Sequence, residues 1–134
     1  MTPPFRAMSH IMYEQLQRLS LALEPLEISG PVWRLLSELH ANGPTRIRDL
    51  ARLSAFERSN VSRLVDKLKD QGLVVSVAAN DRRVHVVELS ELGQAKHAAA
   101  AAIVGTLNTA AISIFLPEEL DQLNRMLNRL SMVL

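Results

Sequence analysis

One short stretch interrupts an otherwise helical sequence, and this interruption constrains the fold more than any other feature. Over most of the chain, apolar residues recur at spacings of three and four, the period of an amphipathic helix. From Leu73 to Ala79 and again from Val84 to Leu89, β-branched and apolar residues dominate instead. The turn signal Asn80-Asp81 lies between the two runs. The sequence therefore predicts a mainly α protein with a small β-hairpin of two strands, an α+β class.

The helical segments around the hairpin have recognisable starts and ends. Pro25 is placed to end the first helix, and Ser29 is a suitable cap for the second, with Pro31 in its first turn. Two short helices joined by a tight turn precede the hairpin, and two longer helices follow it. This order predicts a winged helix-turn-helix at about 29–90 within a single domain covering 1–134. The predicted helices cover about 5–24, 29–42, 47–54, 58–71, 91–115 and 117–134.

Composition excludes several classes of protein. Apolar residues make up 48% of the 134 residues, which argues against intrinsic disorder. The chain contains no cysteine, so disulfide frameworks, Cys-ligated zinc and thiol chemistry are excluded. The start of the chain lacks the pattern of a signal peptide, and its longest uncharged run, 98–117, is too small and polar to span a membrane. We therefore expect a cytoplasmic protein with no membrane partner.

Positive charge is concentrated in the middle of the chain. Residues 46–83 contain nine Lys or Arg and five Asp or Glu, a net charge of +4. The whole chain carries 15 basic and 14 acidic residues, a net +1, so the remainder carries −3. Basic residues thus gather on the predicted helix-turn-helix and hairpin, where the phosphates of a nucleic acid would require them.

The predicted helix at 58–71 has two chemically different sides. Val61, Leu64, Val65 and Leu68 share an apolar side, whereas polar and basic residues occupy the other. Asn, Ser and Arg near the start of a helix can reach base edges and phosphates together. At the hairpin tip, Asp81 would orient Arg83 toward a minor groove. The predicted contacts with double-stranded DNA are Arg58, Ser59, Asn60, Ser62, Arg63, Lys67, Arg82 and Arg83.

Several segments resemble the MarR (multiple antibiotic resistance regulator) family of winged helix-turn-helix regulators. Residues 81–93 resemble the wing signature of that family, Asp-x-Arg followed after five residues by Leu-Thr/Ser-x-x-Gly. Residues 60–68 resemble its recognition helix, 41–44 its break before the helix-turn-helix, and 117–120 the start of its last helix. The similarity covers nearly the whole chain in the right order.

The resemblance implies a homodimeric, ligand-responsive repressor that binds a pseudo-palindromic operator. The terminal helices, about 5–24 and 91–134, would form the dimerisation region. The leucines at 116, 120, 123, 127, 130 and 134 independently indicate a helical contact, because they repeat with the 3.5-residue period of a coiled coil. One departure is Glu57, which stands where the family usually has a Ser or Thr cap on the recognition helix.

The family also implies a small-molecule effector, often aromatic or phenolic, bound between the first, second and fifth helices. The residues expected to gather there are His10, Tyr13, Trp33 and His97. Core packing is the alternative interpretation of the two aromatic residues. The histidine spacings do not match a helical zinc site, so we expect neither a metal nor a cofactor.

Other functions have weaker support in the sequence. No Gly-rich phosphate loop, nucleophile elbow or HExxH motif is present, so we expect no enzymatic activity. The remaining alternative is a protein-interaction adaptor that uses the winged helix as a docking surface. For the outward-facing Arg63, the alternative to DNA contact is a solvated arginine paired with Asp66.

Overall fold

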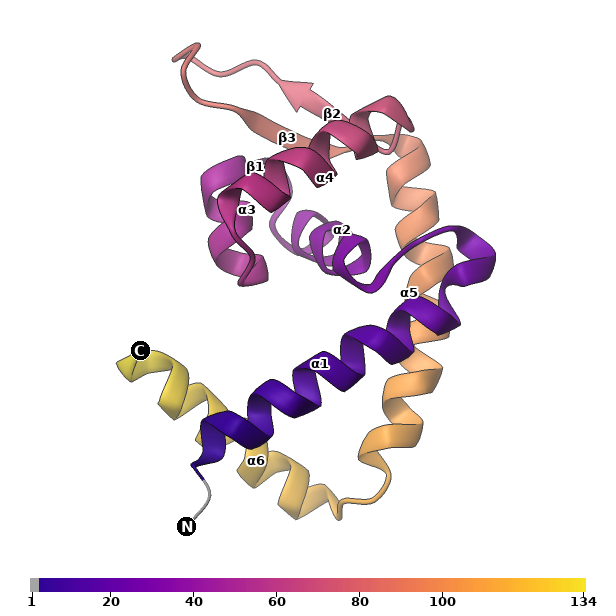
Figure 1. Ribbon diagram of the computed structural model, residues 1–134, viewed down its shortest axis with the longest axis vertical. Coiled ribbons are helices and arrows are strands. Elements are labelled where there is room, and N and C mark those ends of the chain that lie inside the picture. The colour runs from indigo at the N-terminus through magenta and orange to yellow at the C-terminus, as the bar shows by residue number, and fades with distance from the viewer. Residues whose placement is uncertain (1–2) are drawn as a thin grey trace. The chain divides into compact units, whose positions relative to one another are not determined.

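The computed structural model describes residues 3–134, in which helices predominate and a small antiparallel sheet lies near the middle of the sequence (Figure 1). The mainly α class predicted from the sequence is confirmed. The chain divides into two compact units, one reaching to Ala101 and the other covering Ala102–Leu134. Within 3–134, no single helix is long and apolar enough to cross a membrane. The consecutive helices α5 (Glu91–Ile112) and α6 (Pro117–Val133) have the length and composition of a membrane span only when they are taken together, and the pair is sharply bent.

The first two helices cross closely because a glycine lies at their contact. Helix α1 (Pro4–Ala22) is followed by the 3-10 turn η1 (Glu24–Leu26) and by α2 (Gly30–Asn42). The N–H of Gly30 donates to Ser20 Oγ at 2.6 Å, and a Cβ at this position would lie 2.6 Å from the carbonyl oxygen of Leu16. The predicted cap is confirmed, since Ser29 Oγ accepts from the N–H of Val32 at 3.3 Å.

The helix-turn-helix consists of α3 (Ile47–Ser54) and α4 (Arg58–Asp70). Ala55 ends α3 in the left-handed conformation, with φ of 59°, and the N–H of Phe56 bonds the carbonyl of Ala51 at 3.1 Å. Spacing alone suggests that Ala51 and Ala55 both sit at the helix crossing. Ala51 is buried there, but Ala55 is exposed and belongs to the turn. Val61 is fully buried, as predicted.

The sheet contains three strands in the order β1-β3-β2, not the two predicted from the sequence. The hairpin strands β2 (Val74–Val77) and β3 (Val86–Leu89) are shorter than the β-type runs, and β1 (Thr45–Arg46) pairs with β3. A strand of two residues is too short to leave a periodic pattern. It forms because β3 offers it an open edge. The fully buried side chains that fill this part of the core include Leu35, Leu36, Leu50, Val61, Val65, Val74 and Val87.

The junction between the sheet and α5 depends on two small residues. Ser90 Oγ accepts from the N–H of Gly93 at 3.0 Å and donates to the carbonyl of Gly72 at 2.5 Å. A Cβ at position 93 would lie 2.0 Å from the carbonyl oxygen of Leu73, so only glycine fits there. The Leu-Ser-x-x-Gly part of the wing signature is thus explained by a capping serine and a close backbone contact.

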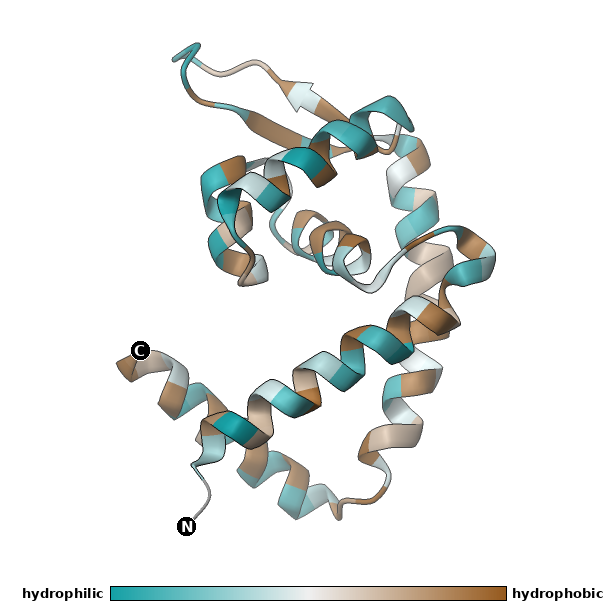
Figure 2. Cartoon of the chain, viewed as in Figure 1, coloured by the Kyte–Doolittle hydropathy of each residue, from teal (hydrophilic) through white to brown (hydrophobic). Residues whose placement is uncertain are grey.

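The unit covering Ala102–Leu134 contains the end of α5 and all of α6, and it exposes much apolar surface. Helix α5 ends at Ile112, three residues before the predicted end at Phe115. Helix α6 starts at Pro117, where Glu119 Oε1 accepts from the N–H of Leu116 at 2.9 Å. None of the α6 residues is buried, and apolar residues recur along it in Figure 2. The exposed large apolar side chains of this unit are Ile112, Ile114, Phe115, Leu116, Met126, Leu127, Met132, Val133 and Leu134.

Candidate nucleic-acid interface

Helix α4 presents the polar face that its sequence predicts. Val61 and Val65 are fully buried and Leu68 is 1% exposed, whereas Leu64 is half-buried at the edge of the apolar side. The helix packs through this side against α3 and β2. Of the predicted DNA contacts on α4, Ser62 is half-buried and the others are exposed: Arg58, Ser59, Asn60, Arg63 and Lys67. Because the core holds the opposite side, these side chains project from a firmly anchored helix.

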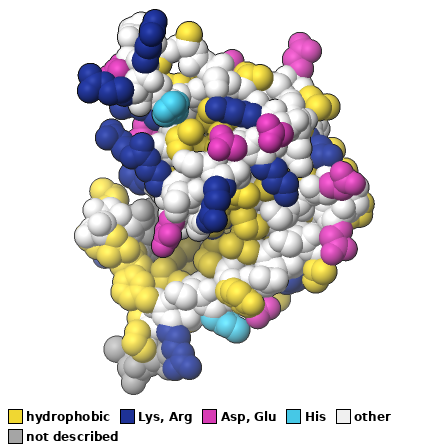
Figure 3. Space-filling model, turned by 45° about the horizontal axis from the view of Figure 1, so that its top comes forward, with side chains coloured by type: hydrophobic (Ala, Val, Ile, Leu, Met, Phe, Trp, Pro, Cys, Tyr) yellow, Lys and Arg dark blue, Asp and Glu magenta, His cyan; other side chains and the backbone are white. Residues whose placement is uncertain are grey.

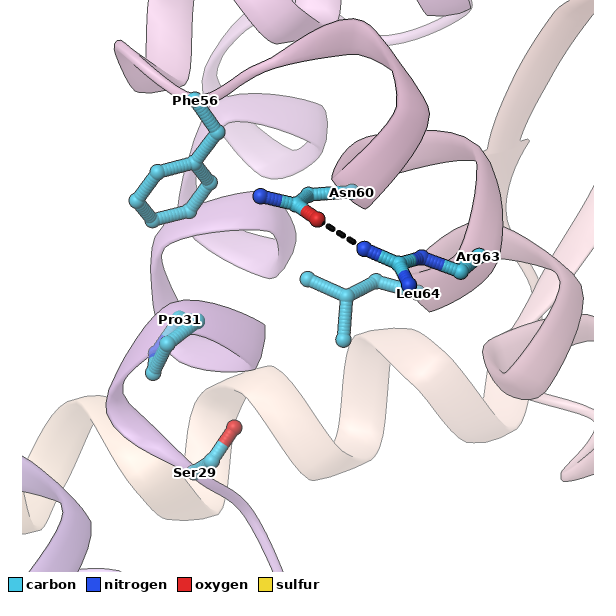
Figure 4. A pocket seen from close by; sticks show the side chains of 6 residues that line it. All are labelled: Ser29, Pro31, Phe56, Asn60, Arg63 and Leu64. Atoms are coloured by element: carbon cyan, nitrogen blue, oxygen red, sulfur yellow. Dashed lines mark hydrogen bonds between the residues drawn. The ribbon is translucent and has the colours of Figure 1, made fainter.

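The side chain of Arg63 is held by Asn60 and not by Asp66, the partner considered from the sequence. Its guanidinium donates a hydrogen bond to Asn60 Oδ1, one turn earlier on the same helix (Figure 4). No ion pair joins Arg63 to Asp66 within residues 3–134. The bond engages one of the five donor hydrogens of the arginine, so the others remain able to reach a base edge or a phosphate.

A hollow of about 380 Å³ lies beside this pair. Its walls are the start of α2, the turn before α4 and α4 itself, and Figure 4 shows Asn60 and Arg63 pointing toward one another on the α4 side. The residues that line it are Ser29, Pro31, Phe56, Asn60, Arg63 and Leu64. The wall of the hollow is mostly apolar, and Asn60 and Arg63 supply its polar groups on the α4 side.

A second feature is a cluster of basic side chains between the start of α3, the start of α4 and the wing, the segment from Val74 to Leu89. Arg46, Arg48, Arg58 and Arg83 surround a small hollow of about 110 Å³ together with His85. Lys and Arg side chains also gather in the upper left of the face in Figure 3. Four arginines at one hollow concentrate positive charge, which Asp49 and Asp81 partly neutralise through ion pairs with Arg46 at 3.7 Å and with Arg83 at 3.6 Å.

Two members of this basic cluster were missed by sequence reasoning. Arg46 and Arg48 contribute to the counted charge of the segment, but nothing in their spacing links them to the wing. The structure links them because β1 pairs with β3 and because the N–H of Ile47 donates to the carbonyl of His85 at 3.0 Å. The start of α3 is thereby attached to the wing at His85 and Val86, close to Arg83.

The wing tip brings Asp81 and Arg83 together. Asp81 Oδ1 accepts from the backbone N–H of Arg83 at 2.9 Å and lies 3.6 Å from its Nε. The Arg83 side chain is 94% exposed, so the ion pair adds little to stability. The backbone bond still fixes the turn from which Arg83 projects. Arg82, its neighbour, is also exposed.

Glu57 occupies the capping position of α4 but does not cap it through its side chain. Its backbone carbonyl accepts from the N–H of Val61 at 3.1 Å, which is the first bond of the helix. The carboxylate is exposed beside the start of α4. It therefore adds negative charge close to the basic residues of this interface.

The four residues expected to form an effector pocket do not all meet. Trp33 and His97 stack with ring centroids 5.0 Å apart and planes 7° apart. Tyr13 is 62% exposed on α1, so it is not a core residue of the described chain, and His10 is exposed as well. The sequence reasoning missed His40, which stacks on His97 with ring centroids 4.1 Å apart.

This aromatic stack joins α2 to α5. His97 is 8% exposed, and burial lowers the pKa of its imidazole below the ordinary value, with a smaller lowering from the charge of His40. His40 Nδ1 lies 3.3 Å from Gln94 Oε1, which ties the stack to α5 a second time. The stack therefore favours a neutral His97. In residues 3–134, no group of three or more His, Cys, Asp or Glu side chains could hold a metal ion.

Comparison with known proteins assigns this geometry to a family. The model of the MarR family matches residues 26–84, which include α2, the helix-turn-helix and most of the wing. Over these residues the chain is similar to the MarR family.

Individual MarR-family proteins are similar over longer stretches. The HTH-type transcriptional repressor IacR of Pseudomonas putida is 26% identical over 91 residues, which are 67% of this chain and 54% of the repressor. The chain thus spans about half the length of this curated relative. A MarR family transcriptional regulator from Silicibacter pomeroyi is 28% identical, with a TM-score of 0.85 over 92% of this chain and 84% of that one.

A third comparison concerns the fold alone. A mutant MarR from E. coli, solved in complex with operator DNA, is 20% identical and has a TM-score of 0.81. The alignment covers 93% of this chain and 91% of that one. The MarR fold therefore extends well beyond the residues that the family model matches.

Proposed function

We propose that the protein is a sequence-specific DNA-binding transcription regulator, a ligand-responsive repressor that binds a pseudo-palindromic operator as a homodimer. The observation that carries this proposal is the exposed polar face of α4 next to a cluster of four arginines at the wing. A helix with an Asn–Arg pair can read base edges in a major groove, and the basic cluster can hold the adjacent phosphates. The similarity of residues 26–84 to the MarR family supports the same function.

The proposed contacts divide into two groups with different tasks. Ser59, Asn60, Ser62 and Arg63 lie on the outward part of α4 and would contact bases. Arg58, Lys67 and Arg82 would contact phosphates, and Arg83, positioned by Asp81, would enter the flanking minor groove. Arg46 and Arg48 join the phosphate group because they share the hollow with Arg58 and Arg83.

A homodimer would cover the apolar surface of the terminal helices. The unit from Ala102 onward exposes nine large apolar side chains, including Ile114 at 79% and Met132 at 86%. Exposed apolar surface of this extent marks an association site. The leucine repeat of α6 provides the 3.5-residue period that a partner helix can pack against.

The proposed effector is a small molecule with an aromatic or phenolic group, bound beside the stack of Trp33 and His97. His97 is buried within the stack, whereas Trp33 is half-buried and His40 is exposed, so Trp33 and His40 can contact an aromatic ligand. The ligand would weaken DNA binding by preferring a conformation that does not fit the operator. The regulator would act without enzymatic activity, metal or cofactor, in the cytoplasm.

DNA binding is tested by selecting duplexes from a random library and measuring their affinity by fluorescence anisotropy over a salt series. We expect enrichment of a pseudo-palindrome with half-sites about one helical turn apart, about 34 Å, and an affinity that falls with salt. A failure to bind any duplex at 50 mM salt by a folded protein would reject the proposal. That result would favour the adaptor interpretation, in which the winged helix docks on a protein.

A further inference from the structure

A further cavity, of about 420 Å³, lies apart from the aromatic stack and shares only Lys67 with the proposed DNA contacts. It lies between the turn before α2, the C-terminal end of α4, the start of β2 and the first turns of α5. None of its residues belongs to the Trp33–His40–His97 stack, and all of them lie in the unit that ends at Ala101. The lining consists of Glu27, Ile28, Ser29, Val32, Lys67, Gln71, Leu73, Leu92 and Lys96.

The walls of this cavity combine an apolar floor with two cations. Ile28, Val32 and Leu73 are buried, at 3%, 8% and 6% exposure, whereas Leu92 is 58% exposed. Lys67 from α4 and Lys96 from α5 line the same space. Within residues 3–134, neither lysine forms an ion pair. The site therefore offers positive charge that no carboxylate of the described chain neutralises by direct contact.

The charge balance of the lining favours a ligand with one negative charge. The lining includes two lysines and one glutamate, Glu27, so its side chains carry a net charge of +1. A single anionic head group matches this charge. A second anionic group on the same ligand would lie near Glu27 or the apolar floor, with no cation to pair with it. The volume lies in the range of small-molecule pockets, and Ile28, Val32 and Leu73 suit a hydrocarbon body.

We propose that this cavity binds a small organic monoanion, a carboxylate carried on an apolar body. Lys67 and Lys96 hold the carboxylate, the apolar floor and Leu92 contact the hydrocarbon, and Glu27 excludes dianions. Binding itself does not depend on the function proposed above. Only its consequence does: a ligand held by both lysines links the helix proposed to read DNA to α5.

Calorimetry with three six-carbon probes tests the ligand class. Hexanoate should bind, while the neutral hexanamide and the dianion adipate should bind at least tenfold more weakly. In the Glu27→Gln variant, the difference in affinity between hexanoate and adipate should be smaller, because the carboxylate that repels the second negative charge of adipate is removed. The proposal is overturned if the protein does not bind hexanoate at millimolar concentration, or if hexanamide binds as well as hexanoate.

Variants then test the location. Lys96→Gln should weaken hexanoate binding about fivefold to tenfold, and Lys96→Arg should restore most of the affinity, since it restores the charge. Lys69→Gln is the matched control, because Lys69 lies in the last turn of α4 but does not line the cavity. Circular dichroism confirms that each variant is folded. Unchanged binding in Lys96→Gln, or loss of binding in Trp33→Leu, would place the ligand elsewhere and overturn the proposal.

The effect on DNA forms a separate measurement. Hexanoate should change the operator affinity of the wild type, and Lys96→Gln should remove this response while leaving affinity without ligand unchanged, because Lys96 is not among the proposed DNA contacts. If the protein binds no DNA, the proposed function fails and the calorimetry still decides the cavity. If DNA binding is intact and hexanoate changes it equally in wild type and Lys96→Gln, the proposed link through this cavity is wrong.

Discussion

Arg83 at the wing tip permits a quantitative test of the DNA interface. Its side chain is 94% exposed and its main partner is Asp81 on the same turn. Arg83→Ala therefore removes no core contact and should change the free energy of unfolding by less than about 0.5 kcal/mol. Any large effect on DNA binding must then come from the lost guanidinium itself.

The expected magnitude follows from counterion release. Each lost phosphate neutralisation reduces the slope of log K against log salt by about 0.9, and a homodimer loses two. The slope should therefore flatten by about 1.8. Between 50 and 200 mM salt, a fourfold range, the ratio of the wild-type affinity to the variant affinity should therefore fall by about twelvefold.

Fluorescence anisotropy with the selected operator and with a random duplex provides the assay. The loss should appear on both duplexes, because Arg83 would sense the shape and potential of the groove more than base identity. Arg18→Ala serves as the control, since it removes one exposed positive charge from α1, outside the proposed interface. If Arg83→Ala leaves both affinities and the slope unchanged in a folded protein, the wing does not contact DNA.

Four other variants test separate parts of the reasoning. Arg63→Ala should cost about 1–3 kcal/mol on the selected operator and relax its sequence preference, measured by anisotropy against single-base substitutions. Leu123→Asp should yield monomers that no longer bind DNA, detected by analytical ultracentrifugation; an intact dimer would contradict the role of α6. Gly93→Ala should lower stability by about 1–3 kcal/mol in chemical denaturation, because its Cβ would lie 2.0 Å from the carbonyl of Leu73. The lowered pKa of His97 means that the unfolded chain binds its proton more readily, so stability should fall as the pH drops below about 6.5, and His97→Gln should flatten this part of the melting profile.

Features that depend on local chemistry could be predicted from the sequence. Ser29 caps α2 because a hydroxyl next to a helix start accepts from the first free N–H groups. The burial of Val61 and Val65 followed from the helical period, and Ser90 with Gly93 indicated the junction after the wing. The two serine caps act on N–H groups three residues away, those of Val32 and Gly93.

Features that depend on residues distant in the chain arise from tertiary packing and could not be predicted from the sequence. Strand β1 exists because β3 has an open edge, and this pairing places Arg46 and Arg48 beside Arg83. In the same way, His40 meets His97 only because α2 packs against α5. Lys67 and Lys96 share a cavity only after α4 and α5 have folded around the start of α2. Periodicity and caps describe each helix separately, so they carry no information about which faces of different helices will meet.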